Sequence, residues 1–366
     1  MEGNFKLEEF LEKAVKSDVS DIHLKVGEHP MVRRDGTILK LDMPKLQRSD
    51  LEFIVNKVVP DFIKDRLSGA TDLDFSFNLK GISRFRVNLS RSMTEYSLVF
   101  RVIPYYINSL EKLHLPAAMH QFADYNNGLV LVTGPTGSGK SSTLASFIES
   151  INLKYQKHIV VLEDPVEFVF TDKKCKVTQR QIGIDTPSFS DGIKYALRQD
   201  PDVILVGEIR DKETLDSTLK AAETGHLVFA TLHTNDAVQT IYRIINMYEP
   251  EDRDTVRHQL AQSLRGTIAQ KLVKKATGNG RYPACEVLVV TPTIKDLIMK
   301  NELEGIYDLV KKGSFNDMIT MNESLYKLVE MGAITKEAAL EASDDKMELE
   351  QFFRGVYRGT KTLGDK

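Results

Sequence analysis

Residues 129–148 read LVLVTGPTGSGKSSTLASFI and decide the fold of the larger part of this chain. An apolar run leads into a glycine-rich turn, and a stretch that favours helix follows. Gly134, Gly139, Lys140 and Ser141 have the spacing GxxxxGK[ST] of a P-loop, whose backbone N–H groups face phosphates. The following helix directs its positive end at the anion. Strand, loop and helix together predict an α/β domain that binds a nucleotide.

The predicted phosphate site extends from the loop into the first residues of the helix. Lys140 is expected to reach the β- and γ-phosphates, and the Ser141 hydroxyl to ligate Mg²⁺. The predicted nucleotide-binding residues are Gly134, Pro135, Thr136, Gly137, Ser138, Gly139, Lys140, Ser141 and Ser142.

Further short apolar runs follow the P-loop. They are KHIVVLED (157–164), DVILVGEI (202–209) and HLVFATLHT (226–234). Short apolar strands interleaved with helices indicate a parallel sheet that is buried on both faces.

Acidic residues stand where two of these runs end. Glu163, Asp164 and Glu167 follow one run, and Glu208 follows another, after Gly207 in the slot where P-loop enzymes usually carry aspartate. Carboxylates beside a phosphate site can position magnesium or activate water. Alternatively, each is a solvated turn residue.

Two histidines flank the third run. His226 precedes it and His233 follows it. They are candidates for sensing the phosphate, and the alternative is a purely structural role.

The chain before the P-loop has a different pattern. A helix is expected over 4–18, a helical stretch over 46–67 with a break at Pro60, and alternating antiparallel strands over 72–79, 83–92 and 96–103. The predicted organisation is a small α+β domain over 1–102, a linker over 103–116, an ATPase core over 117–290 and a helical region over 291–366.

Composition excludes some classes of protein. With 42% hydrophobic and 28% charged residues, the chain of 366 residues is expected to fold. A net charge of −3 argues against a nucleic-acid-binding protein. No apolar run has the length of a membrane span, and the two distant cysteines form no zinc pattern.

Four motifs occur in order: GPTGSGKSST (134–143), LEDPVEF (162–168), RQDPDVILVGEIRD (198–211) and TGHLVFATLHTN (224–235). As a set they resemble the secretion-superfamily ATPases of type IV pili and type II secretion, and in detail the pilus retraction branch. The resemblance extends over nearly the whole chain, including SDIHLKVGEHPMVRRDG (20–36). It implies a RecA-like P-loop ATPase domain joined to a PAS-like N-terminal domain, with ATP and Mg²⁺ as ligands, assembled as a homohexameric ring.

The resemblance also implies roles for individual residues. Glu208 would be the general base on the attacking water, and the Asp box of Glu163, Asp164 and Glu167 would lie near magnesium and the γ-phosphate. His226 and His233 would couple the nucleotide to the ring. Arg86 and Arg101 match the paired sensor arginines of the N-terminal domain, with Arg84 and Arg91 as neighbouring alternatives. The predicted catalytic residues are thus Glu208, Glu163, Arg86, Arg101 and His233.

Two features bear on the branch of the family. Extension ATPases carry a four-cysteine zinc module, which Cys175 and Cys285 cannot supply, so retraction is favoured and no zinc is expected. Retraction ATPases carry a motif close to Ala-Ile-Arg-Asn-Leu-Ile-Arg-Glu, where this chain has Thr293-Ile-Lys-Asp-Leu-Ile-Met-Lys300. The helix can retain its packing with this sequence, but the force-linked role of the motif is open.

The favoured function is therefore a hexameric motor that powers type IV pilus retraction and twitching motility. It would act at the cytoplasmic face of the inner membrane on the platform protein of the pilus machine, without contacting nucleic acid. The alternatives are an accessory retraction paralogue, a related secretion or DNA-transfer ATPase, and a nucleotide-binding regulator that barely hydrolyses ATP.

Overall fold

The computed structural model describes residues 5–17, 19–34, 36–68, 71–103, 106–278, 280–312 and 317–355. Backbone contacts divide the chain into two compact units, Met1–Tyr106 and Ile107–Lys366. The finer division into four segments, with a linker over 103–116, stays a prediction.

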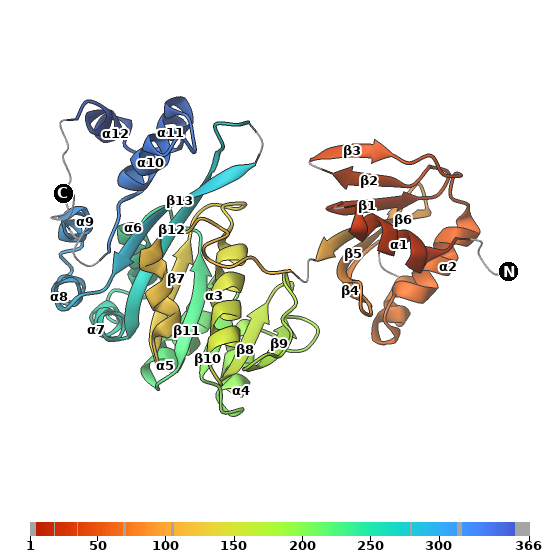
Figure 1. The fold of residues 1–366 in the computed structure, drawn as a ribbon. Helices are drawn as coiled ribbons and strands as arrows, with labels where there is room; N and C mark the ends of the chain where they lie inside the picture. The colour runs from red at the N-terminus through yellow and green to blue at the C-terminus, as the bar shows by residue number, and fades with distance from the viewer. Residues whose placement is uncertain are drawn as a thin grey trace. The chain divides into compact units, whose positions relative to one another are not determined.

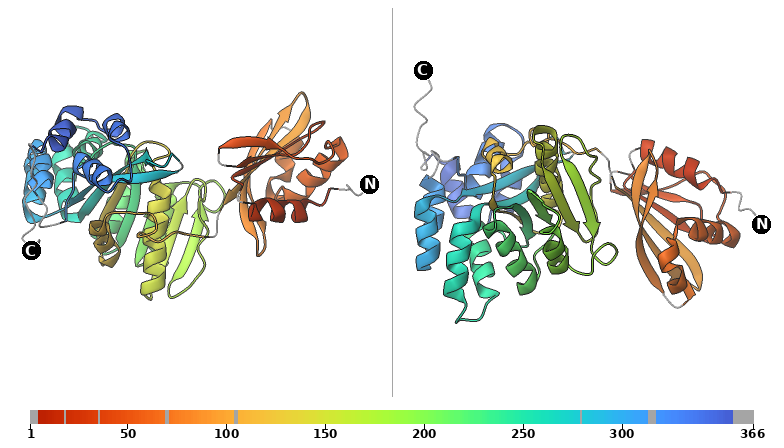
Figure 2. Two further views of the ribbon diagram at one scale, coloured as in Figure 1. Left: turned by 45° about the horizontal axis from the view of Figure 1, so that its top comes forward. Right: turned by 90° about the horizontal axis from the view of Figure 1, so that it is seen from below.

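The first unit contains an antiparallel sheet in the order β3-β2-β1-β6-β5-β4, with helices on one face (Figures 1 and 2). Its elements are α1 (Leu7–Lys16), β1 (Asp21–Lys25), β2 (Met31–Arg34), β3 (Thr37–Lys40), α2 (Arg48–Val58), η1 (Asp61–Ser68), β4 (Asp72–Leu79), β5 (Ser83–Ser92) and β6 (Glu95–Ile103). The predicted strands coincide with β4 and β5, and the helical stretch breaks at Pro60 as expected.

The strand β5 shows why this sheet has one apolar and one polar face. Phe85 and Val87 are fully buried and share a core with Leu11 of α1 and Ile54 of α2. Arg86, between them in sequence, is on the opposite face because successive side chains of a strand alternate. The unit is of the predicted α+β type, and its PAS-like character stays a prediction.

The second unit is built on a sheet in the order β13-β12-β7-β11-β10-β8-β9 (Figure 1). Its strands are β7 (Gly128–Thr133), β8 (His158–Glu163), β9 (Lys176–Gln181), β10 (Val203–Val206), β11 (Leu227–Leu232), β12 (Leu264–Lys274) and β13 (Arg281–Val289). Its first helices are η2 (Ala117–Asp124), α3 (Lys140–Lys154), α4 (Phe189–Ala196), α5 (Lys212–Glu223), α6 (Ala237–Asn246) and α7 (Arg253–Ser263). Neighbouring strands from β12 to β9 run parallel and β13 is antiparallel, which confirms the predicted α/β class.

Both faces of this sheet are buried, which explains its apolar runs. In β7, Leu129 and Leu131 belong to a core shared with α4, α5, α6 and α7, whereas Val130 and Val132 belong to a second core with α3 and η2. A strand between two cores has no solvent-facing position, so it loses the polar–apolar alternation of a half-exposed strand.

The strand register brings four chain segments to one edge of the sheet. Thr133 at the end of β7 pairs with Leu232 of β11, and Val206 of β10 pairs with Leu162 of β8. The segments that follow these four strands therefore emerge side by side. Ligands of open α/β sheets bind at this carboxyl edge.

The last helices that the structure describes are grouped at the β13 end of the sheet (Figures 1 and 2). They are α8 (Pro292–Lys300), α9 (Glu304–Lys312), α10 (Met321–Glu330), α11 (Lys336–Ala342) and α12 (Lys346–Phe353). The predicted helical region is confirmed as far as the structure describes it. Across the described residues, no helix is both long enough and apolar enough to cross a membrane.

Candidate functional site

The P-loop connects β7 to α3, whose first residue is Lys140. The Lys140 ammonium is buried and donates to the carbonyls of Gly134 and Pro135, at 2.8 and 3.1 Å. Burial lowers the pKa of Lys140, and the nearby Glu208 carboxylate opposes that shift. Lys140 thus lies against the loop, and the charge of the candidate base, Glu208, affects its pKa.

The loop has features that fit a phosphate ligand. The Ser138 hydroxyl is buried and has no hydrogen-bond partner among the described residues. Ser141, in the first turn of α3, is exposed. A magnesium ion bound with a nucleotide keeps several waters and takes further ligands from phosphate oxygens, and the P-loop hydroxyl is one of its protein ligands. The residues present therefore fit a nucleotide with its magnesium.

Glu208 follows β10 and lies between two basic side chains. Its Oε1 is 2.9 Å from Nε2 of His233, and its Oε2 is 2.8 Å from a guanidinium nitrogen of Arg210. Burial alone would raise the pKa of Glu208, but Arg210 and then His233 outweigh burial and lower it. The carboxylate is consequently ionised at neutral pH, as a general base must be.

Gly207 leaves little room for the aspartate that other P-loop enzymes place at this point. A Cβ on Gly207 would lie 3.1 Å from the Leu162 carbonyl oxygen and 3.3 Å from Cα of Glu163. Its N–H donates to that same Leu162 carbonyl at 2.7 Å. Close packing of β10 on β8 therefore favours glycine here, and the first carboxylate of the segment is Glu208.

The Asp box lies on the other side of β10, where β8 ends. Glu163 is half-buried, and its carboxylate accepts from the backbone N–H of Glu167 at 3.4 Å and from Gln179 at 3.5 Å. Asp164 is exposed, and its charge adds to that of Glu208 in raising the pKa of Arg210. The box and Glu208 thus share one edge of the sheet, and Glu167 is exposed beside them.

The structure separates the two histidines. His233 follows β11 and contacts Glu208. His226 precedes β11, where its Nδ1 donates to the Ala221 carbonyl at 3.0 Å, so it lies at the opposite edge of the sheet from the P-loop. Of the two histidines of one chain, His233 lies with Glu208 at the P-loop edge of the sheet, and His226 does not.

The two predicted sensor arginines lie in the first unit. Arg86 of β5 pairs directly with Arg101 of β6, so both are on the polar face of that sheet. Nε of Arg101 donates to Asp21 at 2.8 Å, and Arg33 lies 3.9 Å from the same carboxylate. Burial would raise the pKa of Asp21, but the bond from Arg101 helps to lower it.

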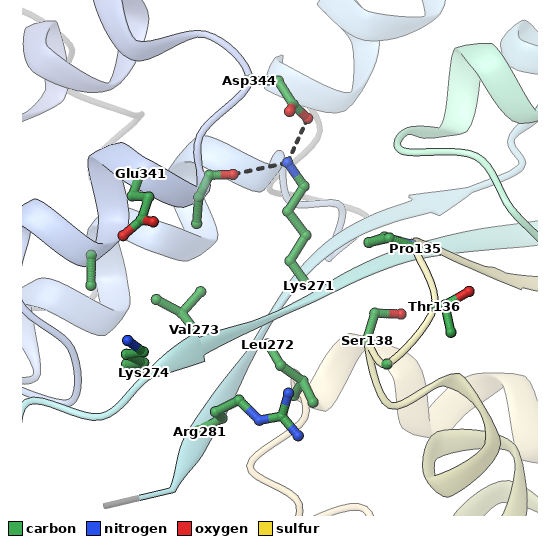
Figure 3. Close-up of a pocket in the computed structure, with 13 residues that line it drawn as sticks. Pro135, Thr136, Ser138, Lys271, Leu272, Val273, Lys274, Arg281, Glu341 and Asp344 are labelled. Atoms are coloured by element: carbon green, nitrogen blue, oxygen red, sulfur yellow. Dashed lines mark hydrogen bonds and ion pairs between the residues drawn. The ribbon is translucent and has the colours of Figure 1, made fainter. Parts of the chain in front are cut away.

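A pocket of about 450 Å³ opens beside the P-loop on the β12 side (Figure 3). Pro135, Thr136 and Ser138 of the loop line one wall, and α11 lines the other. Lys271 of β12 donates to the Ala342 carbonyl at 2.8 Å and pairs with Asp344 at 2.7 Å. β12 is thereby tied to the connection between α11 and α12.

The sequence analysis missed three residues at the site: Arg210, Gln270 and Lys271. Arg210 lies in the segment RQDPDVILVGEIRD (198–211). Its position two residues after Glu208 could have indicated that it belongs to the site. Gln270 is only 2% exposed and donates to the Ser138 carbonyl of the P-loop at 2.7 Å. Neither Gln270 nor Lys271 lies in a recognised motif. Their hydrogen-bond partners are distant in sequence, so no local pattern indicates them.

Comparison with known proteins is consistent with this site. The sequence model of the family described as type II/IV secretion system protein matches residues 5–339. The type IV pilus retraction ATPase PilT of Pseudomonas aeruginosa is 41% identical over 333 residues, covering 91% of this chain and 96% of that protein. A twitching motility protein of Neisseria gonorrhoeae is 42% identical over 310 residues, covering 85% of this chain and 83% of that protein.

Solved structures give the same result. A crystal structure of the pilus retraction motor PilT with bound ADP has a TM-score of 0.89 at 43% identity, covering 95% of this chain and all of that chain (100%). The Legionella pneumophila ATPase DotB has a TM-score of 0.75 at 28% identity, covering 91% of this chain and 94% of its own. Sequence, fold and site agree, and the chain belongs to the family of type II/IV secretion system proteins.

Proposed function

We propose that this chain is an ATPase motor that powers type IV pilus retraction. The observation that carries the enzymatic part is Glu208, an ionised carboxylate whose field reaches the P-loop lysine. The observation that carries the biological part is the similarity to PilT, which covers nearly the full length of both chains.

The site supports hydrolysis of ATP to ADP and phosphate. The P-loop N–H groups and Lys140 hold the phosphates and offset their charge. Ser141 would hold magnesium, which would neutralise charge that develops on the phosphate oxygens. Glu208 accepts a proton from the water that attacks the γ-phosphate, and His233 and Arg210 hold its two oxygens. Glu163, with Asp164 and Glu167, would help to hold magnesium from the adjacent strand end.

Arg86 and Arg101 are proposed to sense the nucleotide from the first unit. An arginine that reaches the transferred phosphate stabilises its charge, which is worth on the order of 10³–10⁵ in rate in other nucleotidases. Such contact would make the position of the first unit depend on the bound nucleotide. In a homohexameric ring, this dependence would pass from subunit to subunit, with His226 as a further link.

The same proposal places the ring at the cytoplasmic face of the inner membrane. There it would act on the platform protein of the pilus machine, without contacting nucleic acid. The net charge of −3 supports the last point, because a nucleic-acid-binding ring is generally basic.

An accessory role beside another retraction motor is the second candidate. The observation that favours it is the sequence of α8. Ile294 and Ile298 are fully buried, so the helix keeps its packing. Lys300 carries a positive charge where the retraction motif has an acid, and it pairs with Asp296 at 2.8 Å. The buried side of the motif is thus retained while its charges differ.

Deletion of the gene tests the proposal. Retraction of fluorescently labelled pili is followed by microscopy, with complementation by the wild type. Cells that carry pili but do not retract them or twitch are expected. Slowed but persistent retraction would favour the accessory role. Cells without pili would contradict retraction and indicate extension.

A further inference from the structure

Gln270 stands beside the first glycine of the P-loop. Ala269 of β12 pairs with Thr133, the last residue of β7, so the next residues on the two strands are Gln270 and Gly134. The Gln270 side chain is buried between β12, the loop and the first turns of α3. It belongs to no motif of the P-loop.

The Gln270 amide is fixed in one orientation by two partners. Its Nε2 donates to the Ser138 carbonyl at 2.7 Å, and its Oε1 accepts from the Thr143 hydroxyl at 2.7 Å. Because a backbone carbonyl can only accept, the amide nitrogen must face Ser138 and the amide oxygen must face Thr143. Thr143 itself is fully buried on α3, so both bonds are shielded from water.

This bond determines the direction of a peptide within the loop. In a trans peptide the carbonyl and the following N–H point in opposite directions. Gln270 turns the Ser138 carbonyl toward β12, so the N–H of Gly139 points away from β12. Backbone N–H groups in the hollow of a P-loop are the ones that bind phosphate.

Both outer glycines of the loop also abut Gln270. A Cβ on Gly134 would lie 2.3 Å from the Gln270 carbonyl oxygen, and a Cβ on Gly139 would lie 2.8 Å from its Nε2. At such distances either a Cβ or its neighbour must move, and both glycines also have positive φ, at 137° and 90°. Gly134 and Gly139, at the beginning and the end of the loop, therefore both pack against Gln270.

We propose that Gln270 is a positioning residue of the nucleotide site, which holds the Ser138–Gly139 peptide in its phosphate-binding orientation. It acts through the loop and does not touch the reacting atoms. The inference rests on the proposed function for the identity of the ligand, a nucleoside diphosphate or triphosphate.

The test measures the Kd of ADP by titration calorimetry, together with thermal unfolding of each variant. Gln270→Glu keeps an acceptor for Thr143 but sets a carboxylate oxygen against the Ser138 carbonyl. We expect its Kd to rise at least tenfold. Thr267→Val is the matched control, since Thr267 is fully buried on the same strand and its hydroxyl has no partner within the described ranges. Its Kd is expected to stay within twofold of the wild type.

A second pair of variants separates positioning from general packing. Thr143→Val removes the donor that fixes the amide, whereas Thr143→Ser keeps it. Thr143→Val should bind ADP more weakly than Thr143→Ser, and this pair decides the matter if Gln270→Glu does not fold. Equal ADP affinity within the pair, or a wild-type Kd in folded Gln270→Glu, overturns the proposal. A wild type that binds ADP but does not hydrolyse ATP would instead refute the proposed function and leave the role of Gln270 standing.

Discussion

Glu208 and His233 follow the ends of two neighbouring strands, β10 and β11, and Oε1 of Glu208 is 2.9 Å from Nε2 of His233. The contact exists because β10 and β11 run parallel and end at the same edge. The contact joins Glu208, which follows β10, to His233, which follows β11. The candidate base is therefore oriented from two sides, by His233 after the neighbouring strand and by Arg210 in its own loop.

Removing Arg210 should shift the pH dependence of catalysis. The acid limb of the kcat profile follows protonation of Glu208, whose pKa Arg210 helps to hold below its ordinary value. In Arg210→Ala this pKa rises, so activity should be lost at a higher pH than in the wild type. Arg210→Lys keeps the charge and should shift the limb less. Identical acid limbs in all three proteins would show that Glu208 is not the titrating base.

Replacing Lys271 should loosen the C-terminal helices. The ammonium is largely buried and has two partners, the Ala342 carbonyl and Asp344. We expect Lys271→Met to lower the free energy of unfolding, measured by urea denaturation, by about 1–2 kcal/mol. Lys327→Met, which breaks the exposed pair with Glu323, should cost less than about 0.5 kcal/mol. Equal losses in the two variants would refute a structural clamp at Lys271.

Glu286 of β13 should make stability fall as pH rises. Burial raises its pKa to about 7, from 4.5 in an unfolded chain, and Asp236 and Asp344 add to the effect. Between these pH values the folded state binds more protons than the unfolded state, so the free energy of unfolding decreases with rising pH. The loss levels off above pH 7 at about 3 kcal/mol.

Glu286→Gln tests this directly, because the amide oxygen can still accept from the Ala237 N–H that bonds to Glu286. Urea unfolding should find the variant more stable than the wild type at pH 8 and nearly equal to it at pH 5. Glu251→Gln, at an exposed position, should be neutral at both. A constant difference across this range would mean that the Glu286 carboxyl does not titrate there.

Much of the fold was predictable because its strands show clear patterns of hydrophobic residues. β4 and β5 alternate and were placed to the residue, and the apolar run of β7 follows from its two cores. The strand β9 was missed because KVTQRQ, at the edge of the sheet, is polar. The antiparallel pair of β12 and β13 was not recognised within the region assigned to the ATPase core.

The site was predictable where chemistry follows a strand end. Glu163, Glu208 and His233 lie at the edge that the parallel order implies. Gln270 was not predictable, since its partners Ser138 and Thr143 lie more than a hundred residues away in sequence.

In the proposed reaction Glu208 is the general base of an ATPase. Steady-state ATP hydrolysis by the purified wild type and by Glu208→Gln tests it most directly, with the Kd of ADP measured on the same samples. Glutamine keeps the size of the side chain but cannot take the proton. We predict a loss of at least tenfold in kcat with nucleotide binding retained. An unchanged kcat in the variant would contradict the assignment.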